Sequence, residues 1–262
     1  DEQEIKFYKK KINLSLAIDE VYIDKIYSVK NLNGKLILQN NKVKNANIEA
    51  KFKNQENIFF SIKSDKEGNK ITTLISSWAK PLISRYKFIK GFDEGVLSLR
   101  SEKNGDVSNS LLIIDNFKVK EIPLLAKLLA MASLQGIADL LTGEGIRFTD
   151  LEMKFSNEKN IMKIDELYAI GPSISLLIDG YLEKDKVLSL RGTLVPASTI
   201  NKTIASIPLI GDLLVGKKVG EGIFGVSFKI KGSPDNPETS VNPIKTLTPR
   251  FITRTLEKIK KN

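Results

Sequence analysis

Residues 161–195 read IMKIDELYAI GPS ISLLIDGYL EKDK VLSLRGTLV and hold three strand patterns in succession. The segments 161–170, 174–182 and 187–195 are rich in Ile, Leu and Val, and turn residues such as Gly, Pro and Asp separate them. Short apolar segments between turn residues are typical of β-strands. Strands joined by connections this short pair antiparallel with the strand before them. The stretch therefore predicts an antiparallel meander.

The same pattern extends in both directions along the chain. In the first hundred residues apolar and polar side chains alternate, as at Ile12, Leu14, Leu16 and Ile18. Alternation with a period of two indicates half-buried strands. Hairpin turns are expected at 33–34, 67–69 and 104–106, where Asn and Gly gather, and further strands at 95–100, 110–119, 145–155 and 224–230.

Two stretches of the chain repeat each other. Residues 122–129 read IPLLAKLL and precede a GEG turn at 143–145, and residues 207–214 read IPLIGDLL and precede a GEG turn at 220–222. The apolar spacing predicts helices at 122–141 and, in two pieces, at 199–215, each followed by a glycine hinge into a strand. A broken helical turn is expected at 72–86, where Pro81 interrupts the spacing. Repetition of a helix-plus-strand unit predicts an elongated, stacked architecture.

Bulk composition describes a folded protein. The 262 residues are 41% hydrophobic and 27% charged. No composition break marks a domain boundary, so we expect one region over 1–262, with a β-meander part at 1–109, a motif-bearing repeat part at 110–246 and a basic amphipathic helix at 247–262. The chain begins at Asp1 without a methionine, and we expect it to be a segment of a longer polypeptide.

Residue types argue against catalysis. The sequence contains no cysteine and no histidine, so thiolate metal sites and cysteine nucleophiles are excluded and the commonest general base is missing. Asp150 and Glu152 can share a strand face and are the best-placed acid/base pair, but a solvated strand face explains them more simply. The GEG turns follow a helix and precede a strand, which reverses the order of a phosphate-binding loop. We expect no enzymatic activity, no cofactor and no bound metal.

The net charge of +10 is compatible with contact to anionic surfaces such as phospholipid headgroups, lipopolysaccharide or nucleic acid, but Lys is spread along the chain and solvated strand faces explain most of it more simply. Nucleic acid is disfavoured as a partner, because aromatic and basic residues alternate and so lie on opposite strand faces. The apolar strand faces have two explanations. They form the ordinary core of a closed sheet, or they line a groove for acyl chains in an open, curled sheet. Periodicity alone favours the core.

Ordered motifs in the second half of the chain carry a resemblance. They are GPS at 171–173, GTLVPA at 192–197, IPLIGDLL at 207–214, GEGIFGVSFKIKG at 220–232 and VNPI at 241–244. Together they resemble the C-terminal region of the AsmA-like family of bacterial envelope proteins, in particular its YhdP-type members, which are related to AsmA and TamB. Lys245 and Arg250 depart from the family pattern and make the tail more basic.

The resemblance implies a periplasmic segment of a protein that is anchored in the inner membrane of a diderm bacterium by a helix outside this sequence. It implies a mainly β fold with short α-helices: an elongated, twisted antiparallel sheet that forms a trough, with apolar helices near the C-terminal end. The implied function is transport of phospholipid between inner and outer membranes through a hydrophobic β-groove, in support of outer-membrane biogenesis. Partners would be phospholipids, anionic bacterial membranes and an outer-membrane or envelope protein. The alternative is a non-catalytic assembly scaffold of the cell envelope with a closed core and no lipid cargo.

Strand alternation and helix position give the candidate site residues. The groove-lining candidates are Ile113, Phe117, Met153, Phe155, Leu176, Ile178, Leu188, Leu190, Phe224, Val226 and Phe228. The candidates for membrane contact are Leu124, Leu125, Leu128, Leu129, Phe251, Lys258, Lys260 and Lys261.

Overall fold

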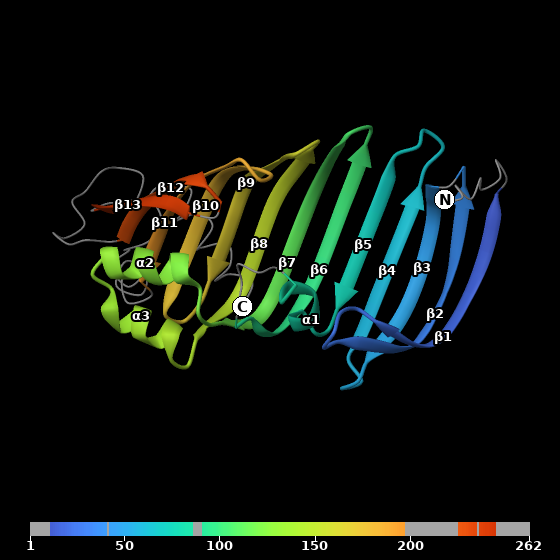
Figure 1. The fold of residues 1–262 in the computed structure, drawn as a ribbon, viewed down its shortest axis with the longest axis horizontal. Helices are drawn as coiled ribbons and strands as arrows, with labels where there is room; N and C mark the ends of the chain where they lie inside the picture. Colours follow the sequence, from blue (N-terminus) through green and yellow to red (C-terminus); the bar gives the residue numbers. More distant parts are fainter. Residues whose placement is uncertain (1–10, 41, 86–90, 197–224, 235, 245–262) are drawn as a thin grey trace, which may run out of the picture.

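A computed structural model describes residues 11–40, 42–85, 91–196, 225–234 and 236–244, and shows one antiparallel sheet with three short helices in these ranges (Figure 1). Its 13 strands lie side by side in chain order, and the sheet does not close. The strands are β1 (Ile12–Tyr22), β2 (Ser28–Gln39), β3 (Lys42–Phe52), β4 (Asn57–Ser64), β5 (Lys70–Ser76), β6 (Asp93–Asn104), β7 (Val107–Val119), β8 (Ile146–Glu158), β9 (Ile161–Ile170), β10 (Ile174–Glu183), β11 (Val187–Pro196), β12 (Gly225–Ser233) and β13 (Asn236–Ile244). The helices are α1 (Lys80–Ile83), α2 (Pro123–Met131) and α3 (Gln135–Thr142).

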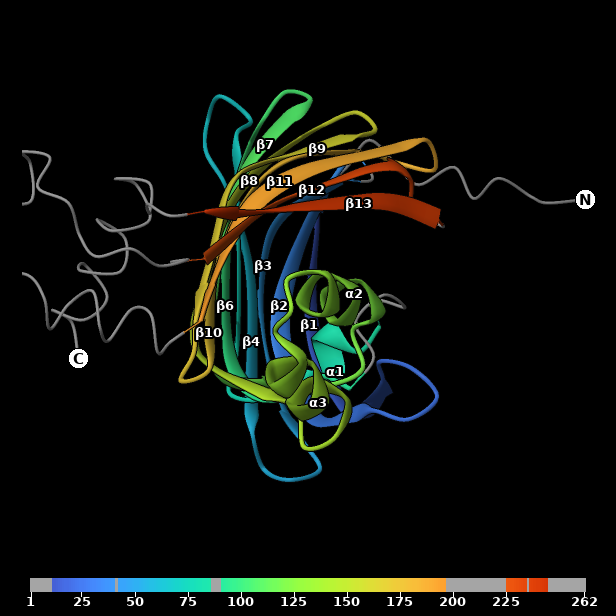
Figure 2. The same cartoon turned by 90° about the vertical axis from the view of Figure 1, so that its left-hand side faces the viewer.

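The sheet is curled, and the described helices lie on its concave side (Figure 2). The predicted fold class, a mainly β, twisted and elongated antiparallel trough, is confirmed. The trough lengthens by adding single strands through hairpins, whereas the internal repeat had suggested stacked helix-plus-strand units. Thirteen strands spaced about 4.8 Å apart give a trough roughly 60 Å long.

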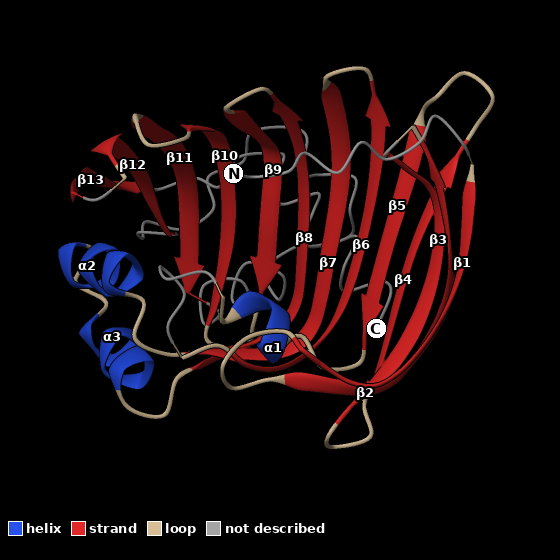
Figure 3. Cartoon of the chain, turned by 45° about the vertical axis from the view of Figure 1, so that its right-hand side comes forward, coloured by secondary structure: helices blue, strands red, loops and turns tan. Residues whose placement is uncertain are grey.

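Two edges of the trough differ because successive connections alternate between them. Connections that follow even-numbered strands are tight turns, and we call this the turn edge. The connections after β5 and β7 carry α1, α2 and α3, and we call the opposite side the helix edge. Figure 3 shows α1 near the middle of the helix edge and α2 with α3 toward the β13 end. The two edges therefore present different surfaces to the solvent.

Cross-strand register defines which side chains share a face. Leu112 of β7 lies opposite Leu99 of β6 and Met153 of β8. Leu99 and Leu112 pack against the apolar core that includes the helices, and Met153 lies beside them on the same face. The neighbouring Ile113 lies opposite Ser98 and Glu152, and strand alternation turns that rung to the convex face. The concave face is therefore the apolar one.

The main core lies between the concave face and α2 and α3. Leu129 of α2 and Leu141 of α3 are fully buried there. Three rings of the same cluster stack in line: Phe92 on Phe117 and Phe117 on Phe148, with centroid separations of 5.3 Å in both pairs. The helices are thus held by close packing against aromatic and aliphatic side chains.

A second, smaller cluster lies at the β1 end of the trough. Val29, Ala50 and Phe52 are buried there, and the ring of Trp78 packs edge-on against Tyr27 at 5.5 Å and Phe52 at 5.4 Å. Trp78 belongs to the connection between β5 and β6, so this cluster ties that connection to the end of β1 and the start of β2.

The broken helix predicted at 72–86 is wrong over its first part. Residues Lys70–Ser76 form β5, and only Lys80–Ile83 are helical. Leu74 lies between Phe60 of β4 and Leu99 of β6, so the strand ladder and its apolar partners outweigh a helical spacing that is local to the sequence. Pro81 sits at the start of α1, where its missing N–H has no cost.

A hairpin turn at 33–34 is also wrong. Asn33 and Gly34 lie inside β2, paired with Ala17 and Leu16 of β1. A Cβ on Gly34 would lie 2.5 Å from the carbonyl oxygen of Asn47, so glycine at this position permits the close approach of β3. The turns predicted at 67–69 and 104–106 are confirmed, since they join β4 to β5 and β6 to β7.

The helical segment predicted at 122–141 is two helices, α2 and α3, separated at Ser133, which has a φ of 57°. The first GEG turn forms the predicted hinge, because α3 ends at Thr142 and β8 begins at Ile146, with Gly145 at a φ of +93°. The strand β13 was not predicted, since Pro237 and Pro243 interrupt its pattern. The second repeat copy at 207–222, the helices at 199–215 and the basic tail at 247–262 lie outside the described residues.

Candidate apolar binding site

The concave face forms a continuous apolar floor across the sheet. One rung runs from Leu16 of β1 through Gly34, Ile48, Phe60, Leu74, Leu99, Leu112, Met153, Leu167, Ile178, Gly192 and Phe228 to Val241 of β13. Side chains directly opposite each other in an antiparallel sheet share a face and touch. The rung contains no charged residue, so an apolar path crosses all 13 strands.

Most of the predicted groove residues lie on this face. Those on the concave face are Phe117, Met153, Leu176, Ile178, Leu188, Leu190, Val226 and Phe228, which belong to its apolar set or lie opposite its members, and Phe155, which alternates with Met153 on β8. Their exposure differs, because Phe117 and Phe228 are buried whereas Ile178, Leu188 and Leu190 are half-buried. Ile113 lies on the convex face, as its pairing with Ser98 and Glu152 shows. Phe224 lies outside the described residues.

Residues of α2 predicted to contact a membrane are mostly part of the core. Leu125, Leu128 and Leu129 are buried against the sheet, and Leu124 is half-buried. These three leucines of α2 therefore pack within the protein. Phe251, Lys258, Lys260 and Lys261 lie outside the described residues.

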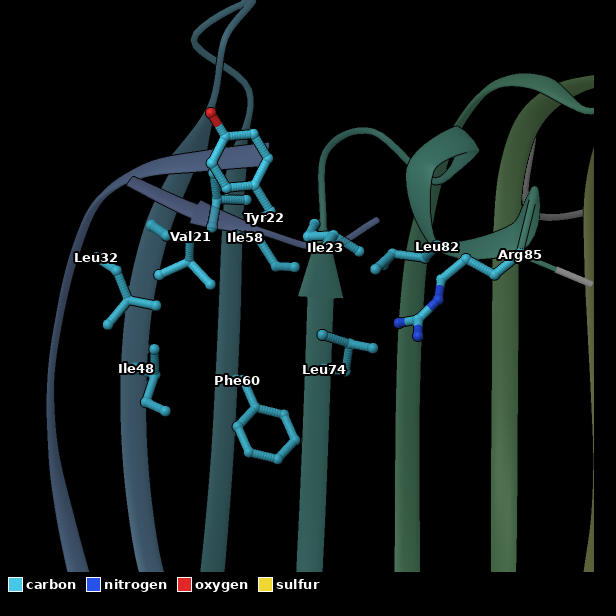
Figure 4. Close-up of a pocket in the computed structure, with 12 residues that line it drawn as sticks. Val21, Tyr22, Ile23, Leu32, Ile48, Ile58, Phe60, Leu74, Leu82 and Arg85 are labelled. Carbon is cyan, nitrogen blue, oxygen red and sulfur yellow. The ribbon is translucent and has the colours of Figure 1, made fainter. Parts of the chain in front are cut away.

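A hollow of about 380 Å³ opens on the concave face at the β1 end (Figure 4). Its floor comes from strands β2 to β5, and its sides come from the end of β1 and from the segment that carries α1. The residues that line it are Val21, Tyr22, Ile23, Val29, Leu32, Ile48, Ala50, Ile58, Phe60, Leu74, Leu82 and Arg85. Ligand pockets typically measure about 300–1,000 Å³ and are mostly apolar with a few polar groups. This hollow has that size and that lining.

The β1–β2 connection is held in place above this pocket by Asp24. Its carboxylate accepts hydrogen bonds from the backbone N–H groups of Ile26 and Tyr27, both at 2.7 Å. These bonds lower the pKa of Asp24, with the bond from Tyr27 contributing most and the positive charge of Arg85 adding to the effect. The connection is therefore an ordered wall of the pocket, built by a local Asx turn.

Arg85 is the only charged residue among the described residues that line the pocket. It follows α1, its side chain is exposed, and Figure 4 shows it reaching back toward the pocket beside Leu82. Among the described residues, Arg85 has no hydrogen-bonded or ion-paired partner. A guanidinium whose donors make no hydrogen bond to the described residues, at the mouth of an apolar hollow, can bind a phosphate or carboxylate, in competition with the charge of Asp24.

Ion pairs reinforce the helix edge near α1. Arg147 of β8 donates two hydrogen bonds to Glu94 of β6, at 2.8 and 2.9 Å, and Lys80 of α1 lies 3.0 Å from Asp93. The pKa of Glu94 is lowered mainly by its hydrogen bonds from Arg147, and that of Asp93 mainly by its hydrogen bond from Lys80. These contacts join α1 to β6 and β6 to β8.

The described residues contain no group of three or more metal-ligating side chains of the His, Cys, Asp or Glu type. Glu152 of the earlier acid/base pair forms an ion pair with Lys154 at 3.3 Å. None of the helices in the described ranges is both long enough and apolar enough to cross a lipid bilayer.

Comparisons with known proteins return nothing: no family model, no curated protein and no solved structure matches the chain. Membership of the AsmA-like family therefore stays a prediction that rests on the motifs in the sequence.

Sequence reasoning missed the pocket. Part of its lining comes from strand ends and connections, namely Val21, Ile23, Leu82 and Arg85. Strand alternation does not predict which way side chains point at such positions. No local signal singles out Arg85, because Lys80 and Lys87 flank it in the sequence. Only the folded connections bring Arg85 next to the floor of β2 to β5.

Proposed function

We propose that this chain is a segment of a bridge-like lipid-transport protein, in which phospholipid acyl chains slide along the apolar floor of an open β-trough. The observation that carries the proposal is the rung of uncharged side chains from Leu16 to Val241, which crosses every strand of a sheet that does not close. The resemblance of the 171–244 motifs to AsmA-like proteins supports a periplasmic setting and transfer between inner and outer membranes.

Transfer energetics explain what such a trough contributes. Each methylene exposed to water costs about 0.8 kcal/mol, so moving an acyl chain through an aqueous compartment is strongly unfavourable. An open apolar trough shields the acyl chains while the polar headgroup stays in water, and this requires no chemical step. The absence of cysteine and histidine from the sequence agrees with a function that needs no nucleophile or general base.

Neighbouring residues on opposite faces give the sharpest test. A photoreactive amino acid would replace Leu112 on the concave face in one variant and Ile113 on the convex face in another. Leu188 and Ser189, both half-buried, form a second such pair on β11. We expect phospholipid adducts, detected by mass spectrometry, at Leu112 and Leu188 and several-fold fewer at Ile113 and Ser189. Equal crosslinking on both faces, or none at either, would contradict the proposal.

The competing function is a cell-envelope scaffold without lipid cargo. The packing of α2 and α3 favours it locally, because Leu129 and Leu141 fill the β13 end of the trough with protein side chains. Native mass spectrometry of gently purified protein separates the two functions. Co-purifying phospholipid supports transport, and protein free of lipid supports the scaffold.

A further inference from the structure

We propose that the pocket at the β1 end of the trough is a binding site for an anionic amphiphile, with one alkyl chain in the hollow and a phosphate group on Arg85. The inference rests on the proposed lipid function and adds to it a defined site and a headgroup charge. It concerns the hollow bounded by the end of β1, the floor of β2 to β5 and the segment that carries α1.

The lining fixes the chemical class of the ligand. All the described lining residues except Arg85 are apolar or aromatic, so the hollow suits hydrocarbon. Arg85 is exposed and makes no hydrogen bond or ion pair with the described residues, so its donors are open to an anion at the mouth, where the carboxylate of Asp24 is the nearby group that feels its charge and would compete for it. A guanidinium matches a phosphate with two parallel hydrogen bonds. An apolar interior with a cation at its exposed margin favours a molecule that has an apolar tail and a negatively charged head.

The position of the pocket would allow an alkyl chain to move between the pocket and the floor of the trough. Leu74 and Leu82 line the hollow and also pack against the main apolar set of the concave face. An alkyl chain held in the pocket is therefore continuous with the floor along which chains would slide. The phosphate would stay at the helix edge, in water, because Arg85 is exposed there.

The chain supplies its own optical probe for this site. Trp78 is the only tryptophan in the sequence, and it packs in the cluster that includes Val29, Ala50 and Ile58, all of which line the pocket. A ligand in the hollow changes the surroundings of this cluster. Trp78 fluorescence should therefore report occupancy without a label.

The experiment titrates the full 262-residue chain with dodecyl phosphate, dodecyl maltoside and inorganic phosphate, each below the concentration at which micelles form. We expect saturable Trp78 fluorescence changes with dodecyl phosphate, and at least tenfold weaker binding by Arg85→Gln. Arg85→Lys should lie between the two, since it keeps the charge and loses the fork of donors. Arg100→Gln is the matched control: it removes the same charge, and Arg100 lies on the convex face opposite Thr73 and pairs with Glu102.

Three outcomes would overturn the inference. Arg85→Gln could bind dodecyl phosphate as tightly as the unaltered chain, dodecyl maltoside could bind as tightly as dodecyl phosphate, or inorganic phosphate could bind equally well without a tail. Circular dichroism checks that each variant is folded. If Arg85→Gln does not fold, the affinity of Arg85→Lys for dodecyl phosphate decides the test instead. If lipid adducts form at Leu112 but dodecyl phosphate binding does not depend on Arg85, the pocket proposal is wrong and the transport proposal stands. An Arg85-dependent titration without any lipid adduct would reject the transport function and leave an amphiphile site.

Discussion

Gly192 of β11 shows how closely single residues are constrained in the trough floor. It lies directly opposite Phe228 of β12, and a Cβ placed on it would be 2.5 Å from the ring Cζ and 2.5 Å from the carbonyl oxygen of Leu177. Gly192→Ala must displace the ring or the backbone, so we expect it to lower the free energy of unfolding by about 1–3 kcal/mol in urea denaturation.

Gly136 of α3 provides the control for that substitution. A Cβ on Gly136 meets nothing within 4 Å, and the residue is inside a helix. Gly136→Ala should raise the free energy of unfolding by up to about 1 kcal/mol through helix propensity alone. If the two alanine variants changed stability in the same direction, the close approach of Phe228 to Gly192 would be wrong.

Some residues of the site were predictable from sequence and others were not, for a physical reason. The alternation of Val226, Phe228 and Ile230 with Ser227 and Lys229 predicted one buried face, and the structure confirms it, with the three apolar residues at 3–5% exposure. Alternation depends only on the pleat of the strand itself, so it can be predicted without knowing which strands lie beside it. The role of Gly192 depends on a ring from the next strand, which no local pattern encodes.

At the scale of elements, α2 is attached to the sheet chiefly by buried leucines. Leu129 has no exposed surface, and replacing it with alanine leaves a cavity between helix and sheet. We expect Leu129→Ala to lower the free energy of unfolding by about 2–5 kcal/mol, measured by urea denaturation. Lys127→Ala, on the exposed side of the same helix, should change it by less than about 0.5 kcal/mol. Similar losses for both variants would mean that α2 is not docked by this face.

A second prediction concerns the ion pair that links β6 to β8 across β7. Glu94 has its pKa lowered by Arg147, so the pair stabilises the fold above the ordinary pKa of 4.5 and loses this effect as pH falls through the lower, folded value. Glu94→Gln should therefore be less stable than the unaltered chain at pH 7, by less than about 1 kcal/mol because both side chains are partly exposed. The difference should vanish at pH 2 in urea denaturation and shrink in 1 M salt at pH 7. A difference that persisted at pH 2 would exclude the ion pair as its cause.

Element prediction succeeded where local and long-range forces agree. The strands β9, β10 and β11 were predicted within a residue of their observed bounds, because apolar content and turn residues both point to the same ends. It failed at 72–76, where a helical spacing was overruled by pairing with β4 and β6, and at Gly34, where close strand approach mimicked a turn. Both failures involve neighbours that are distant in the sequence.

At the scale of the whole molecule, the important property of the trough is that the rung from Leu16 to Val241 along its floor carries no charged side chain. Its central polar spot is a hydroxyl pair, Ser101 of β6 and Ser110 of β7, whose Oγ atoms lie 2.9 Å apart on the concave face opposite Phe155 of β8. Uncharged hydroxyls bonded to each other interrupt an apolar path little. A charge at the same place would be different, because an acyl chain cannot solvate it.

The trough proposal therefore predicts a block by Ser101→Asp, with Ser98→Asp as its control. Both serines lie on β6 and are half-buried, but Ser98 lies opposite Ile75 and Ile113 on the convex face. We expect Ser101→Asp to reduce phospholipid adducts at a photoreactive residue at Leu188 at least threefold, because acyl chains would have to pass a carboxylate in the middle of the floor. Ser98→Asp should leave these adducts unchanged, and urea denaturation of both variants separates a block from unfolding. Equal adduct yields in two folded variants would show that lipid, if bound, does not travel along this face.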